Sequence, residues 1–148
     1  MEKELTIRRM TKEDVEDVAA LESACFSRPW TQKDFSESLE KDYYLFYVGY
    51  MDGRHVATAG LTITAPEADV TNVAVLRDMR GQGVAYRLLS EMMEDAASLG
   101  VSDFTLEVRS GNEAAIALYE KLGFVSEGVR KGFYEDPKED AVIMWKRG

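Results

Sequence analysis

Two glycines stand directly before a stretch of helical pattern and could bind a phosphate. The segment is Arg80-Gly81-Gln82-Gly83, and apolar residues recur at helical spacing from Val84 to Leu99. Glycine leaves the backbone amides uncovered, so the free N–H groups at the start of this helix, aided by its dipole, can bind a phosphate or pyrophosphate. Arg80 can add a charge-assisted contact.

This loop alone does not identify a particular phosphate-binding motif. Neither Gly-x-x-x-x-Gly-Lys nor Gly-x-Gly-x-x-Gly occurs in the chain, so it is not a Walker loop or a dinucleotide fingerprint. A tight turn that uses two glycines remains an alternative. One histidine, His55, and one cysteine, Cys25, cannot form a His/Cys zinc cluster, and no metal is expected. We expect His55 to be a solvated surface residue and Cys25 a small buried one rather than a nucleophile.

The elements that position the loop alternate between strand and helix patterns, which predicts an α/β fold. Thr11 and Thr31 can each cap a helix, and Asn112 opens a further one. A strand, helix and strand over 68–108 imply a right-handed parallel crossover in a mixed sheet. The expected strands are 5–10, 43–50, 56–64, 68–76, 103–108, 124–130 and 141–146, and the expected helices follow Thr11 and Thr31 and cover 84–99 and 112–122.

Length and composition indicate one globular domain over residues 1–148. The chain is 45% hydrophobic and 30% charged, and it lacks both an apolar run of membrane-spanning length and a signal-like start at Met1–Leu5. Together with the single cysteine, this predicts a soluble cytoplasmic protein without membrane association. The net charge of −9 argues against direct nucleic-acid binding and suits a basic partner, although acidity for solubility explains it as well.

Three further segments extend the pattern. These are Thr105-Leu106-Glu107-Val108-Arg109, Asn112-x-x-Ala-x-x-Leu-Tyr119, and Lys121-Leu-Gly-Phe124. With the glycine loop, they resemble the GNAT acetyltransferase superfamily. The segments Cys25-Phe-Ser-Arg-Pro-Trp-Thr31 and Glu139-Asp-Ala-Val-Ile-Met144 are similar to its RimI-type members, which acetylate the N-terminal alanine of a small-subunit ribosomal protein.

The resemblance implies a fold and a co-substrate, acetyl-CoA. The fold is a mixed, mostly antiparallel sheet of about seven strands with about four helices, in which two parallel central strands, 68–76 and 103–108, splay apart. The pantetheine arm then lies in the opening, paired with the strand backbone as an added strand would be. The implied cofactor-binding residues are Val73, Ala74, Val75, Arg80, Gly81, Gln82, Gly83, Val84, Ala85, Tyr86 and Asn112.

The same resemblance implies two catalytic residues. An amine protonated near neutrality must lose a proton before it attacks a thioester, and Glu107 is the implied general base. Tyr119 is the implied general acid, which protonates the departing thiolate. Taken without the motif, Glu107 reads as a solvated carboxylate at a strand end and Tyr119 as an aromatic residue packed in the core.

The acceptor is expected to be an α-amine. Phe26, Trp30, Phe133 and Tyr134 could line a peptide groove, although core packing explains Phe26 and Trp30 equally well, and Phe133 stands where many relatives have tyrosine. A chain N-terminus has a pKa of about 8 and lysine one of about 10.4, so deprotonating lysine costs about 3.5 kcal/mol more.

The expected partner is a basic protein N-terminus, that of the eighteenth small-subunit ribosomal protein. The alternatives are a lysine side chain, a small-molecule amine, or a non-catalytic module that senses acyl-CoA.

Overall fold

One mixed sheet organises the chain in the computed structural model, which describes residues 4–148. Within that range seven strands lie in the order β1-β2-β3-β4-β5-β7-β6, and every neighbouring pair is antiparallel except β4 and β5. This confirms the predicted fold class and order of elements. The strands are β1 Leu5–Arg9, β2 Tyr44–Met51, β3 Arg54–Thr64, β4 Glu67–Val75, β5 Asp103–Arg109, β6 Val125–Tyr134 and β7 Glu139–Lys146.

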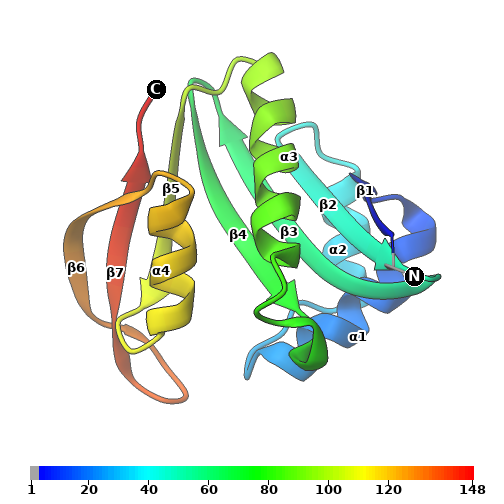
Figure 1. The fold of residues 1–148 in the computed structure, drawn as a ribbon, viewed down its shortest axis with the longest axis horizontal. Helices are drawn as coiled ribbons and strands as arrows, with labels where there is room; N and C mark the ends of the chain where they lie inside the picture. The colour runs from blue at the N-terminus through cyan, green and yellow to red at the C-terminus, as the bar shows by residue number, and fades with distance from the viewer. Residues whose placement is uncertain (1–3) are drawn as a thin grey trace.

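The parallel pair stays together over only one end of its length. Residues Glu67–Asp69 of β4 pair with Asp103–Thr105 of β5, and beyond them the two strands diverge (Figure 1). On its other side, β4 carries a bulge against β3, where Asn72 adopts a left-handed conformation with φ of 52°. An extra residue in one strand bends that strand. The predicted splay of the two central strands is therefore present.

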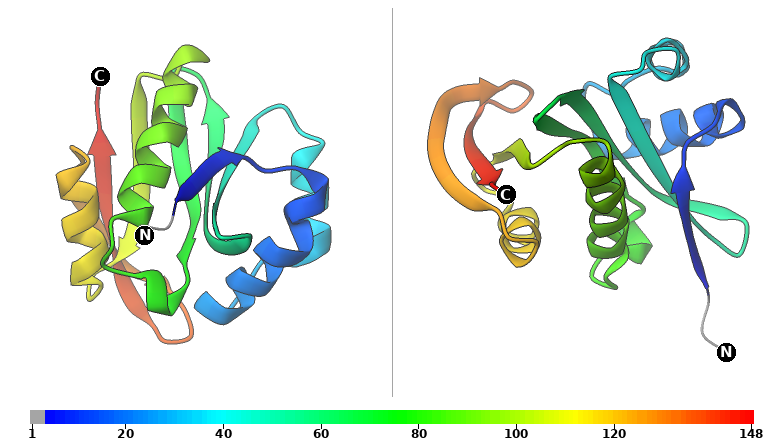
Figure 2. Two further views of the ribbon diagram at one scale, coloured as in Figure 1. Left: turned by 45° about the vertical axis from the view of Figure 1, so that its right-hand side comes forward. Right: turned by 90° about the horizontal axis from the view of Figure 1, so that it is seen from above.

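Helices cover both faces of the sheet (Figure 2). In the described part of the chain these are α1 Val15–Cys25 and α2 Gln32–Leu39 on one face, and α3 Val84–Ser98 and α4 Glu113–Lys121 on the other. Short 3-10 helices precede α1, at Lys12–Asp14, and follow β4, at Arg77–Met79. The larger apolar core lies under α3, and a smaller one lies under α1 and α2.

Local capping fixes where two of these helices begin. The Asp34 N–H donates to Thr31 Oγ1 at 3.2 Å, and the Thr31 N–H donates to Asp34 Oδ2 at 2.9 Å, so α2 starts with a reciprocal capping box. The Ala115 N–H donates to Asn112 Oδ1 at 3.1 Å at the start of α4. The predicted caps at Thr31 and Asn112 are confirmed, whereas Thr11 caps the 3-10 helix that precedes α1.

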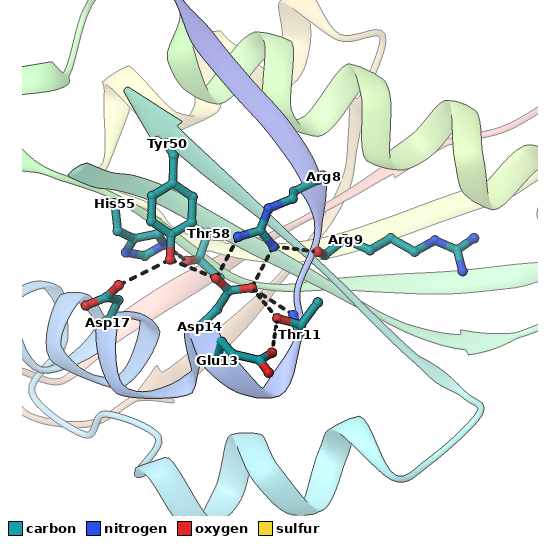
Figure 3. Close-up of polar contacts among 9 residues, drawn as sticks. All are labelled: Arg8, Arg9, Thr11, Glu13, Asp14, Asp17, Tyr50, His55 and Thr58. Carbon is teal, nitrogen blue, oxygen red and sulfur yellow. Dashed lines mark hydrogen bonds and ion pairs between the residues drawn. The ribbon is translucent and has the colours of Figure 1, made fainter. Parts of the chain in front are cut away.

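A buried carboxylate, Asp14, ties the first strand to the sheet (Figure 3). It is 2% exposed and accepts two hydrogen bonds from Arg8, at 2.7 and 2.8 Å, one from the Tyr50 hydroxyl at 2.8 Å and one from the Thr11 N–H at 2.8 Å. His55 lies beside this cluster, with Nε2 2.7 Å from Thr58 Oγ1, and burial lowers its pKa. The prediction that His55 is a solvated surface residue was therefore wrong.

The last hairpin is longer than predicted. Strand β6 reaches Tyr134 rather than residue 130, because the left-handed Gly132 (φ 62°) is held within it by a 2.8 Å hydrogen bond from its N–H to Asp140 Oδ1. Among residues 4–148, no helix is long and apolar enough to cross a membrane. The expectation about a leader at Met1–Leu5 falls partly on residues 1–3, which lie outside the described residues.

Candidate active site

The divergence of β4 and β5 opens a cleft of about 1330 Å³. Residues from both strands, from the starts of α3 and α4, from the end of α1 and from the β6–β7 hairpin line it. Of the residues predicted for the site, the cleft gathers all but Gln82, namely Phe26, Trp30, Val73, Ala74, Val75, Arg80, Gly81, Gly83, Val84, Ala85, Tyr86, Glu107, Asn112, Tyr119, Phe133 and Tyr134.

The glycine loop forms one end of the cleft and presents bare backbone there. Gly81 and Gly83 have φ of 77° and 80°, values that L side chains rarely adopt, and Gly83 is the N-cap of α3. A Cβ placed on either glycine would meet no heavy atom of the described chain within 4 Å. Gly83 and the first residues of α3 line the cleft, and a helix start has unpaired N–H groups, which fits the binding of a pyrophosphate such as that of acetyl-CoA.

The side chains around this loop are held by local hydrogen bonds. Arg80 donates from Nε to the Val75 carbonyl at 3.2 Å and from Nη2 to Cys25 Sγ at 3.7 Å, so its guanidinium lies at the cleft end of β4. Gln82 points elsewhere, since its Nε2 donates to the Asp78 carbonyl at 3.0 Å and the residue lines a separate hollow of about 570 Å³.

Glu107 projects from β5 into the cleft. Its neighbours Leu106 and Val108 are buried in the core under α3, so alternation along the strand sends Glu107 to the opposite face. The side chain is 37% exposed, and Arg130 of β6 lies 3.9 Å from its Oε1. The carboxylate is thus accessible to a substrate, and a cation lies beside it.

Tyr119 reaches the cleft from α4. It is 7% exposed, its ring packs edge-on against Phe124 with 5.8 Å between centroids, and burial raises the pKa of its hydroxyl to about 12. Such a phenol stays protonated at neutral pH and can donate a proton or a hydrogen bond. Burial also raises the pKa of Tyr134, with the charge of Glu107 as the next cause, while the Arg109 guanidinium lies 4.4 Å from the Tyr134 ring centre.

Aromatic residues and one ion pair line the far end of the cleft. Phe26 and Phe133 are 39% and 42% exposed, which is unusual for phenylalanine in a core, whereas the ring of Trp30 packs 5.2 Å from that of Phe35 in the smaller core. Arg28 joins the α1–α2 connection to the β6–β7 hairpin through a 2.7 Å contact with Asp136. Trp30 therefore both lines the cleft and packs in the smaller core, while Phe26 lies mainly at the surface of the cleft.

The cleft also contains residues that the sequence reasoning missed. Glu22 of α1 and Thr71 and Asn72 of β4 all line it. Cys25, expected in the core, is only half-buried there. A signal existed for Glu22, because it falls at helical spacing after Val15, Val18 and Ala19 and so shares the buried face of α1. Within residues 4–148, no group of three or more His, Cys, Asp or Glu side chains is placed to hold a metal ion.

Comparison with known proteins extends these observations. A family profile described as "Acetyltransferase (GNAT) family" matches residues 15–124. The [ribosomal protein bS18]-alanine N-acetyltransferase of Escherichia coli strain K12 is 34% identical over 141 residues, which cover 94% of this chain and 95% of that protein. N-alpha-acetyltransferase RimI of Mycobacterium tuberculosis is 34% identical over 146 residues, covering 95% of this chain and 90% of that protein.

A solved structure agrees with the sequence comparison. The crystal structure of the ribosomal-protein-S18-alanine N-acetyltransferase from Escherichia coli superposes with a TM-score of 0.87, covering 97% of this chain and 94% of that one at 34% identity. The arrangement of strands and helices around the cleft is therefore the arrangement of that enzyme.

Proposed function

The chain belongs to the GNAT family of acetyl-CoA-dependent N-acetyltransferases, and we propose that it acetylates the N-terminal α-amine of a protein, namely the N-terminal alanine of ribosomal protein bS18. The observation that carries the proposal is one cleft that holds the glycine loop at one end and Glu107 and Tyr119 along its walls. Similarity over nearly the full length to an enzyme named for this acceptor supports its identity. We further propose that residues 1–148 form a single domain. We place the protein in the cytoplasm, because ribosomal proteins are made there.

The glycine loop and β4 supply the co-substrate site. The N–H groups of Gly81, Gly83 and the first turn of α3 bind the pyrophosphate, and Arg80 adds positive charge at the end of β4. Beyond Asp69, β4 has no pairing with β5, so the backbone of Val73–Val75 can pair with the amides of the pantetheine arm. This places the thioester near the middle of the cleft.

Transfer proceeds directly from the thioester to the amine. Glu107 accepts a proton from the acceptor ammonium, directly or through water, and the resulting amine attacks the thioester carbonyl carbon. The new C–N bond replaces the C–S bond, and the departing thiolate takes a proton from Tyr119, whose raised pKa keeps it protonated until then. The nitrogen then loses its second proton, which passes through water to Tyr119 and restores the phenol. No covalent acyl-enzyme step is needed, and Cys25 has no histidine partner among its described contacts.

The acceptor is an α-amine because of the energetics of its deprotonation. The pKa of an α-amine lies about 2.5 units below that of lysine, which corresponds to about 3.5 kcal/mol at a fixed pH. A single accessible carboxylate base meets the smaller demand more readily. The net charge of −9 also attracts a basic peptide to the cleft through electrostatic steering.

A panel of acceptors tests this assignment. Steady-state rates are measured with a basic peptide that begins Ala-Arg, with the same peptide blocked at its α-amine, and with spermidine. We expect the free peptide to react fastest, and its rate to fall as salt rises because exposed charges are screened over about 8–10 Å. Equal labelling of free and blocked peptides would identify a lysine acetyltransferase, and preference for spermidine a small-molecule one. Tight binding of acetyl-CoA without transfer to any amine would indicate a sensor.

A further inference from the structure

Two buried oxygens in the cleft have no hydrogen-bond partner. Among the residues that the structure describes, Glu22 Oε2 and Thr71 Oγ1 are the buried side-chain polar atoms left unpaired. Buried polar groups in native proteins are almost always hydrogen-bonded, so unpaired ones require an explanation. Both of these residues line the same cleft as Glu107 and Tyr119. Their common position indicates that a ligand in the cleft completes their hydrogen bonding.

The carboxylate of Glu22 is anchored through only one of its oxygens. Oε1 accepts a hydrogen bond from Asn72 Nδ2 at 3.0 Å and lies 3.5 Å from the Trp30 backbone nitrogen. Glu22 is 4% exposed, and burial raises its pKa. Oε1 thus fixes the side chain against the left-handed residue of the β4 bulge, and Oε2 is left buried without a donor.

Glu22, Thr71 and Glu107 lie on the same side of the sheet. Val70 is buried in the core under α3, so Thr71 projects to the opposite face, where α1 packs on β4. Asp69 of β4 pairs with Thr105 of β5. Two residues further along each strand, Thr71 and Glu107 lie level with each other across the opening. Two carboxylates and a hydroxyl from three elements therefore lie on one side of the sheet and line the same cleft.

These three groups all accept hydrogen bonds, so they favour a ligand that is a cation with several N–H donors. A buried carboxylate without a positive partner is costly, and the cost is relieved by a bound ammonium. An ammonium group has three N–H donors, which matches two carboxylates and one hydroxyl that all accept.

We propose that Glu22 and Thr71 bind the α-ammonium group of the acceptor and present it to Glu107. Glu22 Oε2 and Thr71 Oγ1 each accept one N–H, which orients the third toward the base. No proton moves to Glu22 in this step, so it is a substrate-binding residue and not the base. The inference rests on the proposed function, because it assumes that an amine enters this cleft.

The test compares binding of an acceptor peptide with binding of its des-amino analogue, in which hydrogen replaces the α-ammonium. Dissociation constants are measured by calorimetry for the wild type, Glu22→Gln and Thr71→Val. Glutamine keeps an oxygen for Asn72 Nδ2 but loses the charge, and the neutral amide is easier to bury, so this variant is expected to fold. Valine keeps the shape of threonine without its hydroxyl.

We expect Glu22→Gln to weaken the amine peptide about 10-fold or more and to leave the des-amino peptide unchanged. Thr71→Val should act in the same direction with a smaller effect. The affinity for acetyl-CoA should not change in either variant. As a control, Asn72→Gly keeps the left-handed backbone and removes only the contact with Glu22 Oε1. If Glu22 acts only by holding the bulge, Asn72→Gly will reproduce the loss and Glu22→Gln will not.

The outcomes separate this inference from the proposed function. Equal weakening of both peptides by Glu22→Gln, or no weakening of either, would overturn the role of Glu22 while wild-type acetylation of the free amine continued. Failure of the wild type to acetylate any α-amine would instead overturn the proposed function.

Discussion

Placing a carboxylate at Gly83 should weaken acetyl-CoA binding through charge alone. Gly83→Asp is compared with Gly83→Asn, which has the same shape without the charge. The φ of 80° strains both variants by about 1 kcal/mol, and a Cβ there meets no heavy atom of the described chain within 4 Å, so neither clashes. A unit charge about 4 Å from a phosphate costs about 1–4 kcal/mol, depending on the local dielectric.

The exposure of this loop sets the expected size of the effect. Gly83 is exposed, so screening places the cost at the lower end, about 1–2 kcal/mol, or about 5- to 30-fold in the dissociation constant. Calorimetry of acetyl-CoA at low salt measures both variants, with circular dichroism to show that they are folded. The Asp variant should bind more weakly than the Asn variant, and the gap should narrow as salt rises. Equal affinities for the two folded variants would refute the assignment of the loop to the pyrophosphate.

Three further predictions follow from the site and the fold. Glu107→Gln should lower kcat by about 10²–10⁴-fold with unchanged acetyl-CoA affinity, and a variant that kept its activity across the pH range would place the base elsewhere. Tyr119→Phe should lower kcat by a smaller factor than Glu107→Gln. Because burial raises the pKa of Tyr119 to about 12, the wild-type pH–rate profile should show no loss of this proton donor between pH 7 and 10, and a tyrosine-dependent limb there would contradict its role. Asp14→Asn should lower the free energy of unfolding in urea by about 2–3 kcal/mol. Burial alone raises the pKa of Asp14, but the hydrogen bonds from Arg8, Thr11 and Tyr50 outweigh it and hold the pKa well below its ordinary 3.8, so its contribution is full above that pH and is lost as the pH falls through the folded-state value. An Asn variant that was as stable as wild type at pH 7 would show that the network around Asp14 is dispensable.

Features with a local cause could be predicted from the sequence. The order of strands and helices follows from local hydrophobic periodicity, and the caps at Thr31 and Asn112 depend on residues three positions away. The glycine pair at 81 and 83 signals left-handed backbone before a helix, which is what the structure has. The roles of Glu107 and Tyr119 came from motif resemblance rather than from any local rule.

Features that depend on distant contacts could not be predicted. Glu22 meets Asn72, fifty residues away, only because α1 packs on the bulge of β4, and nothing near either residue in the sequence indicates that pairing. The environment of His55 likewise depends on β3 lying beside the Asp14 network. Strand β6 was expected to end at residue 130, yet Gly132 lies within it because Asp140 on the partner strand holds the Gly132 N–H.

The most direct test of the central claim is site mapping on an intact acceptor. Unacetylated ribosomal protein bS18 is incubated with the enzyme and acetyl-CoA, and the modified positions are determined by tandem mass spectrometry over time. The proposed function predicts one added acetyl group, on the α-amine of the N-terminal alanine, at a rate that Glu107→Gln lowers by about 10²–10⁴-fold. Acetylation spread over lysine side chains would contradict it. So would an N-terminus that stays unmodified after a long incubation with excess acetyl-CoA.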